Sequence, residues 1–392
     1  MAMPKPSRPS NQYDLAIAGG GLAGGLVALA LAKLRPDLDI ALIEAEDHFG
    51  GNHIWSFFES DIEPEHRWLV EPLISRRWDS YDVHFPKYSR RLRNEYFSIE
   101  SKNLDRELRE RLPLAALKAG QKARKVKEEL VELADGSEIA ARAVLDVRGG
   151  GDVTALDIGW QKFCGQMLKL KEPHGLERPV IMDATVEQID GYRFVYCLPF
   201  GATEIFVEDT YYADTADLDS VISHGLIADY AAEQGWNIEA VLSEEKGQLP
   251  VIYGGDFEAF WQANKGVDAR AGARAALIQP ITSYSLPMAV KTAILIAEMP
   301  VITQDTLDKM LRNLAEKHWK SGKFYRMLCA FLFLGTDPHQ RYRTLEHTYS
   351  KDEKLLARFY AGKSTRMDQI NLLTGKPPIP ISRAIPLLLK YK

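Results

Sequence analysis

The sequence has little of several features that mark common protein classes. Its three cysteines, Cys164, Cys197 and Cys329, lie far apart with no CxxC spacing, so neither a disulfide framework nor a zinc site is expected. Its nine histidines form no HExxH or His/Cys cluster, and we predict no metal site. Positive charge is not in excess, because 49 Lys and Arg stand against 54 Asp and Glu. We therefore expect no nucleic-acid partner, since phosphate binding requires clustered basic residues.

Long uncharged stretches are also scarce, with one exception. Residues 15–32 carry 18 residues without a charge, at the lower limit for a membrane-spanning helix. Glycines interrupt this run, however, and favour a buried strand at residues 13–18, a turn, and a helix at 26–34. The polar, proline-bearing residues 1–12 are interpreted as a disordered leader rather than an export signal.

The turn within that run carries a nucleotide-binding pattern. Gly19, Gly21 and Gly24 form GxGxxG between the predicted strand and helix, where glycines let the backbone approach a pyrophosphate at the helix N-terminus. A second apolar strand at residues 40–43 ends at Glu44, which lies about 20 residues after Gly24. A carboxylate at that spacing is expected to accept hydrogen bonds from the ribose hydroxyls. The motif alone leaves FAD and NAD open.

Two later segments favour FAD over NAD. The first is a second glycine-rich turn soon after Glu44, and the second is a strand-like stretch at residues 143–147 that runs into more glycines. Either is compatible with an ordinary loop when taken singly, but their order along the chain favours a flavin. The candidate flavin contacts that they add are Gly50, Gly51, Asn52, Arg148 and Gly149.

The remaining patterns predict an α/β protein with three regions. Asp135-Gly136 marks a hairpin between residues 126–133 and 138–145, residues 192–209 are strand-like, and residues 218–236 and 306–318 have helical periodicity. We predict a Rossmann-like FAD/NAD(P)-binding domain, an antiparallel-sheet substrate domain and a helical C-terminal region. The expected division is a leader at 1–12, a discontinuous FAD-binding domain at 13–75, 96–160 and 265–300, a substrate-binding domain at 76–95 and 161–264, and the helical region at 301–392.

Matches in order along most of the chain carry a resemblance to one family. They are GGGLAGG at the N-terminus, GGNHIWSF at 50–57, VLDVRG at 144–149, IMDATVEQIDGYRFVYCLPF at 181–200, IFVEDTYY at 205–212, YSLPMAV at 284–290, and LLARFYAGK and LTGKPPIP near the C-terminus. The sequence resembles bacterial lycopene beta-cyclases, a family of FAD-dependent enzymes. The resemblance implies a fold like that of flavin hydroxylases and geranylgeranyl reductases. It also implies reduced FAD supported by NAD(P)H, and conversion of lycopene through gamma-carotene to beta-carotene without net redox change.

Ring closure needs a proton on an unactivated alkene, and therefore a carboxylic acid that burial keeps protonated. Alternation along IFVEDTYY lets only one of Glu208 and Asp209 face a pocket, with Phe194 and Tyr196 of the preceding strand beside it. On the pattern alone, such a pair is more typical of a solvated strand edge. The resemblance implies that Glu208 is the acid and that Asp209 is a supporting carboxylate.

The segment before YSLP departs from the family. Relatives usually carry glycine before the tyrosine, with Gly and His upstream, whereas this chain has Ala276, Gln279 and Ser283. The resemblance implies that Ser283 and Tyr284 contact the flavin. If the glycine position requires a positive φ, serine there costs about 1 kcal/mol.

Membrane contact is expected because lycopene is a hydrocarbon that resides in the bilayer. Residues 324–334 are apolar but too short to span, and fit either a buried core helix or an apolar portal. Residues 385–389, followed by Lys390 and Lys392, are a second candidate for interfacial contact. We expect a cytoplasmic protein associated peripherally with the inner face of the cell membrane. Other carotenoid-pathway enzymes are candidate partners.

Two other functions remain open at this point. A flavin-dependent isoprenoid reductase or hydroxylase would consume NAD(P)H stoichiometrically. A non-catalytic, membrane-associated carotenoid-binding protein would lack flavin after purification.

Overall fold

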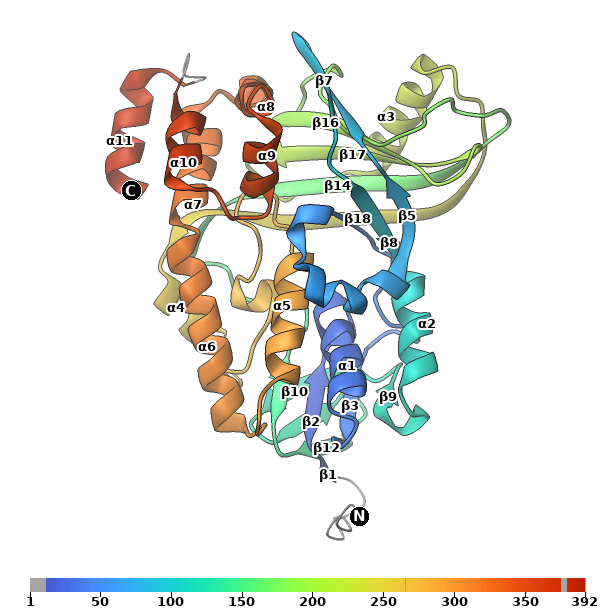
Figure 1. Cartoon of the computed structure of the whole chain (residues 1–392), viewed down its shortest axis with the longest axis vertical. Helices are drawn as coiled ribbons and strands as arrows, with labels where there is room; N and C mark the ends of the chain where they lie inside the picture. The colour runs from blue at the N-terminus through green and yellow to red at the C-terminus, as the bar shows by residue number, and fades with distance from the viewer. Residues whose placement is uncertain (1–11, 265, 375–378, 392) are drawn as a thin grey trace.

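The computed structural model of the chain describes residues 12–264, 266–374 and 379–391. Figure 1 shows two layers, with a small parallel sheet and its helices below and a broad antiparallel sheet above, flanked on one side by the C-terminal helices. The mixed α/β class predicted from the sequence is confirmed. Residues 1–11 of the predicted leader lie outside the described residues. Gln12, its last residue, belongs to strand β1 and pairs with Ala140.

The lower layer is built on a parallel sheet in the order β13-β2-β3-β9. Helix α1 (Leu22–Leu34) follows β2 and packs against α2 (Ser101–Arg111) and α5 (Leu286–Ala297). The uncharged run at 15–32 is therefore a buried strand, a turn and a helix. Within the described ranges, no helix is both long and apolar enough to cross a membrane. The strands of this sheet are β2 (Leu15–Ala18), β3 (Ile40–Ile43), β9 (Leu117–Lys118) and β13 (Val144–Asp146).

A second small sheet, β1-β12-β11-β10, corrects one detail of the predicted hairpin. The Asp135-Gly136 turn does join β11 to β12, but residues 126–133 are not one strand. Residues 128–129 form a tight turn, in which Glu129 has φ +59°, and β10 and β11 pair antiparallel on either side of it. The segment 138–145 also divides, and β13 crosses into the parallel sheet. The strands are β1 (Gln12–Tyr13), β10 (Ala123–Lys127), β11 (Leu130–Leu133) and β12 (Glu138–Ala141).

The upper layer is a seven-stranded sheet in the order β18-β14-β17-β16-β15-β6-β7. Its pairs are antiparallel except for β15 with β6. One face packs against helix α3 (Ser220–Glu233), and the other faces the C-terminal helices and a three-stranded sheet, β4-β8-β5. The strands are β4 (Ile54–Phe58), β5 (Ile74–Trp78), β6 (Tyr81–Phe85), β7 (Tyr88–Leu92), β8 (Tyr96–Glu100), β14 (Leu156–Leu170), β15 (Val180–Asp183), β16 (Tyr192–Pro199), β17 (Glu204–Ala213) and β18 (Ile238–Gly255).

The described residues beyond 300 are helical and contain no strand, as the sequence predicts. Side chains of the apolar segment 324–334 lie mostly in the core, so the buried-helix interpretation fits better than an exposed portal. The helices are α6 (Gln304–Ser321), α7 (Lys323–Ala330), a π-helical turn (Phe331–Gly335), α8 (Tyr342–Tyr349), α9 (Glu353–Tyr360), α10 (Arg366–Leu373) and α11 (Ile381–Tyr391).

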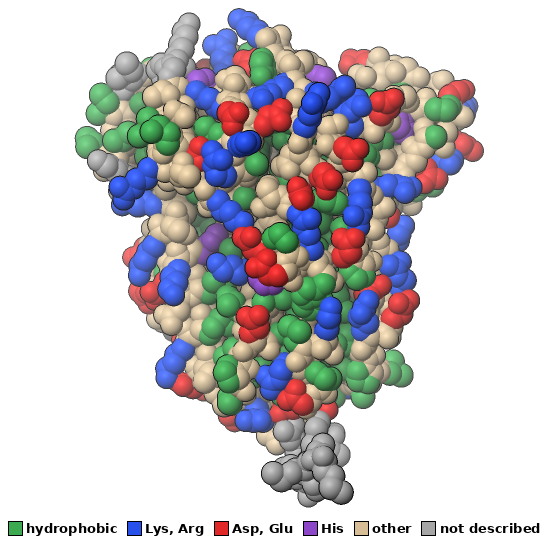
Figure 2. Space-filling view, in the orientation of Figure 1, with side chains coloured by type: hydrophobic (Ala, Val, Ile, Leu, Met, Phe, Trp, Pro, Cys, Tyr) green, Lys and Arg blue, Asp and Glu red, His purple; other side chains and the backbone are tan. Residues whose placement is uncertain are grey.

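Charges of both signs are intermixed over much of the face seen in Figure 2. Hydrophobic side chains gather at its upper left, over α10 and α11. One group of exposed apolar side chains on this face therefore lies near the C-terminal end of the chain.

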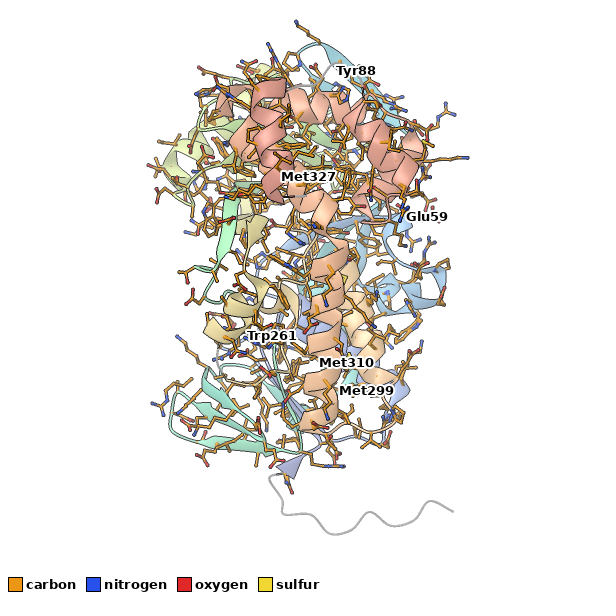
Figure 3. The ribbon with its side chains drawn as sticks, turned by 90° about the vertical axis from the view of Figure 1, so that its left-hand side faces the viewer. Glu59, Tyr88, Trp261, Met299, Met310 and Met327 are labelled. Atoms are coloured by element: carbon orange, nitrogen blue, oxygen red, sulfur yellow. The ribbon has the colours of Figure 1, made fainter. Side chains whose placement is uncertain are left out.

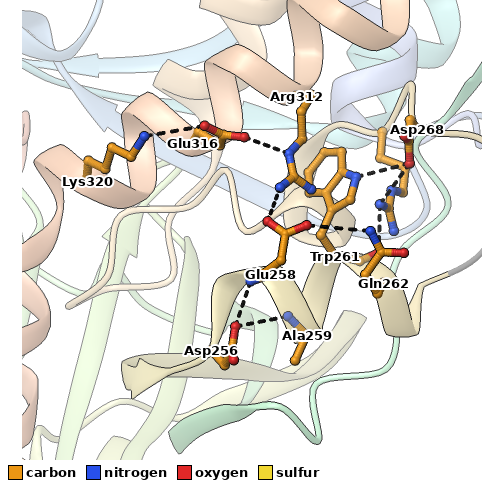
Figure 4. A network of polar contacts seen from close by, with 10 residues as sticks. Asp256, Glu258, Ala259, Trp261, Gln262, Asp268, Arg312, Glu316 and Lys320 are labelled. Atoms are coloured by element: carbon orange, nitrogen blue, oxygen red, sulfur yellow. Dashed lines mark hydrogen bonds and ion pairs between the residues drawn. The ribbon is translucent and has the colours of Figure 1, made fainter.

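Helices α6 and α7 connect the two layers. Figure 3 shows α6 rising past Met310 in the lower layer, with Met327 of α7 in the upper layer. Arg312 of α6 binds Glu258 of the short helix α4 (Phe257–Ala263) and lies 4.7 Å from the ring centroid of Trp261 (Figure 4). This contact holds α4 against α6, next to the chain that leads into the loop before α5.

Candidate functional site

The turn between β2 and α1 has the geometry of a nucleotide-binding loop. Gly19 adopts φ +117°, and a Cβ atom on Gly24 would lie 1.9 Å from the Gly19 carbonyl oxygen. A Cβ atom on Gly21 would meet nothing within 4 Å, so open space lies beside the backbone there. Glu44 Oε2 accepts a 2.8 Å hydrogen bond from the Gly20 N–H, so the acid lies against the loop.

The other candidate flavin residues of the first 150 positions surround this loop. The Gly50 N–H donates to the Gly20 carbonyl at 2.9 Å, and Gly50 and Gly51 have φ values of +86° and +65°. Asn52 points elsewhere, since its side chain donates to the Glu244 carbonyl at 2.7 Å. These contacts place the second glycine turn directly beside the first.

Arg148 and Gly149 follow β13 and reach the same loop. A Cβ atom on Gly19 would lie 2.8 Å from the Arg148 backbone nitrogen, and one on Gly149 would meet no atom within 4 Å. The Arg148 side chain pairs with Asp146 at 2.7 Å. The open space beside Gly21 and Gly149, at a strand-to-helix turn, fits a dinucleotide pyrophosphate.

Two residues of the loop before α5 have positive φ values without being glycine. Ser283 adopts φ +54°, and Ala276 adopts φ +52°. Two hydrogen bonds hold Ser283, from its Oγ to the Pro250 carbonyl at 2.6 Å and from its N–H to the Gln279 carbonyl at 2.8 Å. Ser283 and Tyr284 both line the cavity described next.

A largely aromatic cavity of about 350 Å³ lies between the two layers. It is bounded by the face of the large sheet opposite α3, which we call the cavity face. Its other boundaries are β4 and β8, the loop before α5, and α8 and α9. Its aromatic lining is Trp55, Phe57, Phe58, Tyr96, Phe163, Phe194, Tyr196, Tyr212, Tyr284, Tyr349 and Tyr360, and its ionisable polar residues are His53, Asp61, Glu208 and Glu245. Such a lining excludes water and presents electron-rich rings to a cation.

Glu208 projects from β17 into this cavity. Thr210 Oγ1 donates to Glu208 Oε1 at 2.6 Å. Burial, and after it the charge of Glu245, raises the pKa of Glu208 to about 8. The residue is half-buried and lines the cavity. Glu208 is thus a protonated acid at neutral pH.

Asp209 lies on the opposite face of β17, as strand alternation requires. Its carboxylate accepts a 2.6 Å bond from Arg193 Nε and a bond from the Tyr211 hydroxyl. It does not line the cavity, and it is a minor cause of the raised pKa of Glu208. Phe194 and Tyr196 line the cavity beside Glu208, as the sequence predicts.

Sequence reasoning missed two of the cavity carboxylates, Asp61 and Glu245. Burial raises the pKa of Asp61 to about 6. Its Oδ2 accepts hydrogen bonds from the Phe58 N–H at 2.8 Å and from the Tyr284 hydroxyl at 3.2 Å. Glu245 binds His53 at 2.8 Å. Both stand in charged stretches that resemble solvated surface, so only the packing of distant segments reveals them.

Comparisons with known proteins bear on this site. The family model described as lycopene cyclase protein matches residues 14–385. A lycopene beta-cyclase of Pantoea ananas is 43% identical over 374 residues, covering 95% of this chain and 97% of that protein. A lycopene beta-cyclase of a Paracoccus species is 39% identical over 385 residues, covering 95% and 96%.

Solved structures resemble the fold at low identity. A geranylgeranyl bacteriochlorophyll reductase-like protein of Thermoplasma acidophilum has a TM-score of 0.59 at 13% identity, covering 97% of this chain and 100% of that chain. The flavin-dependent brominase Bmp2 also has a TM-score of 0.59, at 15% identity, covering 97% and 99%. These likenesses concern the fold alone.

Proposed function

The chain belongs to the lycopene cyclase family, and from that premise we propose that it is a lycopene beta-cyclase that closes rings at the linear ends of lycopene through gamma-carotene to beta-carotene. The observation that carries the proposal is Glu208, a carboxyl kept protonated to about pH 8 inside an aromatic cavity. An acid of this kind is what protonation of an unactivated alkene requires.

The chemistry is a proton-initiated, redox-neutral cyclisation. Glu208 donates its proton to the terminal double bond, and the resulting tertiary cation is attacked by the neighbouring double bond. The ring cation then loses a proton. Aromatic rings such as Tyr196 and Phe194 stabilise the cation, and the apolar lining keeps out water that would trap it.

We assign the glycine loops to FAD, with NAD(P)H as the source of its electrons. Gly19, Gly21 and Gly24 would hold the pyrophosphate and Glu44 the ribose. The other proposed contacts are Gly50, Gly51, Arg148, Gly149, Ser283 and Tyr284, and Asn52 would contribute only its backbone because its side chain binds the Glu244 carbonyl. Reduced FAD would supply negative charge near the reacting end of the substrate.

The proposed division into domains follows the same assignment. Segments 13–75, 96–160 and 265–300 form the FAD-binding domain, 76–95 and 161–264 the substrate-binding domain, and 301–392 the helical region. The cavity between the layers is then the meeting point of cofactor and substrate.

Glu208→Gln tests the acid. The variant is expected to lose about a hundredfold or more in rate, because Gln cannot donate a proton to an alkene. The measurement is product formation from lycopene in anaerobic vesicles with FAD and NADPH. Asp209→Asn, on the other face of β17, is the matched comparison and is expected to retain more activity. Cyclisation by Glu208→Gln at the wild-type rate would contradict the assignment.

The same assay separates the alternatives. In solvent deuterium, the ring is expected to gain deuterium, and no label is expected to pass from the nicotinamide. Transfer of nicotinamide label into the product would instead indicate a reductase or hydroxylase. Absence of flavin after purification would favour a carotenoid-binding protein.

A lipid surface is the proposed source of substrate. Exposed apolar side chains cluster on α10, α11 and the π-helical turn, namely Leu334, Met367, Ile370, Leu373, Ile385 and Leu389. A second apolar cavity lies behind them and shares Ile281 and Leu345 with the first. Lys351, Arg383 and Lys390 would favour anionic headgroups there. This arrangement supports peripheral attachment at the inner membrane face; Lys392 lies outside the described residues.

A further inference from the structure

Two cavity carboxylates lie in one row across the large sheet. Glu208 of β17 and Glu245 of β18 are both directly opposite Gly165 of β14, so all three residues lie on the same face. Two strand spacings separate the backbones of the two acids by about 10 Å. The two carboxyl groups therefore flank a position that has no side chain of its own.

The space above Gly165 is filled by an aromatic ring. A Cβ atom at this position would lie 2.3 Å from the ring of Phe206, which is on the cavity side of β17. The Phe206 ring therefore covers Gly165, and it is an apolar group between the two acids. A hydrocarbon end held in the cavity, which Glu208 and Glu245 both line, would have both carboxyl groups beside it.

The two carboxyl groups differ in their partners. Glu208 accepts a hydrogen bond from the Thr210 hydroxyl. Glu245 Oε1 lies 2.8 Å from His53 Nδ1, and its Oε2 accepts a 3.0 Å bond from the Ile54 N–H. Two donors aimed at one carboxyl group suit an ionised acceptor. Glu245 thus has two hydrogen-bond partners where Glu208 has one.

His53 strengthens this difference. Its hydrogen bond to Glu245 raises the pKa of the imidazole above its ordinary value, which favours the positively charged ring. The Glu245 side chain is 6% exposed and that of His53 is 43% exposed. His53 also lines a separate hollow together with Ser101 and Lys102. The buried carboxylate thus has its counter-charge at the boundary with solvent.

We propose that Glu245 is the base that removes the final proton from the ring cation, and that His53 positions it. This inference rests on the proposed function. The Glu208 O–H bond breaks as a C–H bond forms on the terminal alkene carbon, and the new ring C–C bond follows. The C–H bond beside the cationic carbon then breaks, its electrons form the ring double bond, and Glu245 takes the proton. Each closure moves one proton from Glu208 to Glu245, and exchange with solvent restores both.

The position of the ring double bond reports on this base. Wild type is expected to form only beta rings. Glu245→Gln keeps a side-chain oxygen that can accept the hydrogen bond from the Ile54 N–H, but the amide cannot take up a proton. We expect its rate to fall by about a hundredfold, and epsilon or gamma rings to appear because another neighbouring carbon loses its proton. A role in packing alone would lower the rate without changing the ring isomer.

Glu244→Gln is the matched control. Glu244 is adjacent on β18 but faces α3, where its Oε1 accepts from Gln166 Nε2 at 2.9 Å. It is expected to give beta rings at the wild-type rate. Isomer analysis by chromatography and NMR, together with FAD content and circular dichroism of each variant, completes the comparison.

If Glu245→Gln does not fold, His53→Asn tests the same inference. This variant keeps Glu245 but removes the imidazolium beside it. We expect slower turnover than in wild type, and epsilon or gamma rings in a smaller proportion than is expected from Glu245→Gln. If the variant that folds forms only beta rings at the wild-type rate, the proposed role of Glu245 is wrong. The proposed function would still stand in that case. If wild type itself forms no ring from lycopene, the proposed function fails.

Discussion

Burial keeps the Glu208 carboxyl protonated well above the pH at which a free glutamate ionises. The pKa is about 8 in the folded protein, against 4.5 for the ordinary group. Between these values the unfolded chain releases a proton that the folded chain retains. The free energy of unfolding therefore decreases as the pH rises through this interval, by at most about 1.4 kcal/mol per pH unit, and the effect levels off above pH 8.

Glu208→Gln is expected to remove this dependence. The variant should be more stable than wild type at pH 8, and the difference should shrink toward zero near pH 4.5, where both chains hold a neutral side chain. Denaturant unfolding between pH 5 and 9 measures it, with Glu244→Gln as a surface control that follows wild type. A stability difference that does not vary with pH would contradict the raised pKa.

Single residues were predictable where the requirement is local. The positive φ of Ser283 agrees with the glycine that the family resemblance implies at this position, and the opposed directions of Glu208 and Asp209 follow from strand alternation. Glu245 was not predictable, because its neighbours His53 and Gly165 come from distant parts of the chain.

Among the secondary-structure elements, the unit of β2, turn and α1 depends on two glycines for different reasons. A Cβ atom on Gly24 would meet the Gly19 carbonyl, which is backbone and cannot move aside, whereas Gly21 faces open space. Gly24→Ala is expected to lower the free energy of unfolding by about 2 kcal/mol or more.

Gly21→Ala is the matched variant. It should unfold much like wild type but bind FAD more weakly, because the new methyl group occupies the space assigned to the pyrophosphate. Denaturant unfolding and flavin content after purification measure the two effects. Equal losses of stability in both variants would contradict this distinction.

The elements predicted best were those with their own turn or periodicity. The Asp135-Gly136 hairpin, the strand before Glu44 and the C-terminal helices all match. The prediction of one strand over 126–133 was wrong because a turn at Glu129, without glycine or proline, interrupts it. Turns formed by charged residues give weak sequence signals.

For the whole molecule, the proposed contact with lipid rests on the exposed apolar side chains of α10 and α11. The double variant Ile385→Glu with Leu389→Glu places two charges on α11 and is expected to weaken binding to anionic vesicles by about tenfold or more. Vesicle sedimentation measures it. Val221→Glu with Ile222→Glu, on exposed apolar positions of α3, is the control and should bind as wild type does. Equal effects of both pairs would contradict the assigned surface.

The sequence predicted the fold class of the two layers, but it did not predict the cavity between them. The glycine motif is contiguous and has a known structural meaning, so the nucleotide loop could be located from the sequence. The cavity draws residues from β4 at one end of the chain to Tyr360 at the other. No local pattern records such an assembly.

The place of β14 between β17 and β18 has a consequence for synthesis of the chain. β14 is made first, and its two partners follow tens of residues later, one after the other. Glu208 can take its place once β17 has paired, but the row across Gly165 is complete only when β18 emerges. A nascent chain halted before β18 would therefore hold Glu208 without the opposite Glu245, and the cavity would be complete only after α8 and α9 are also made.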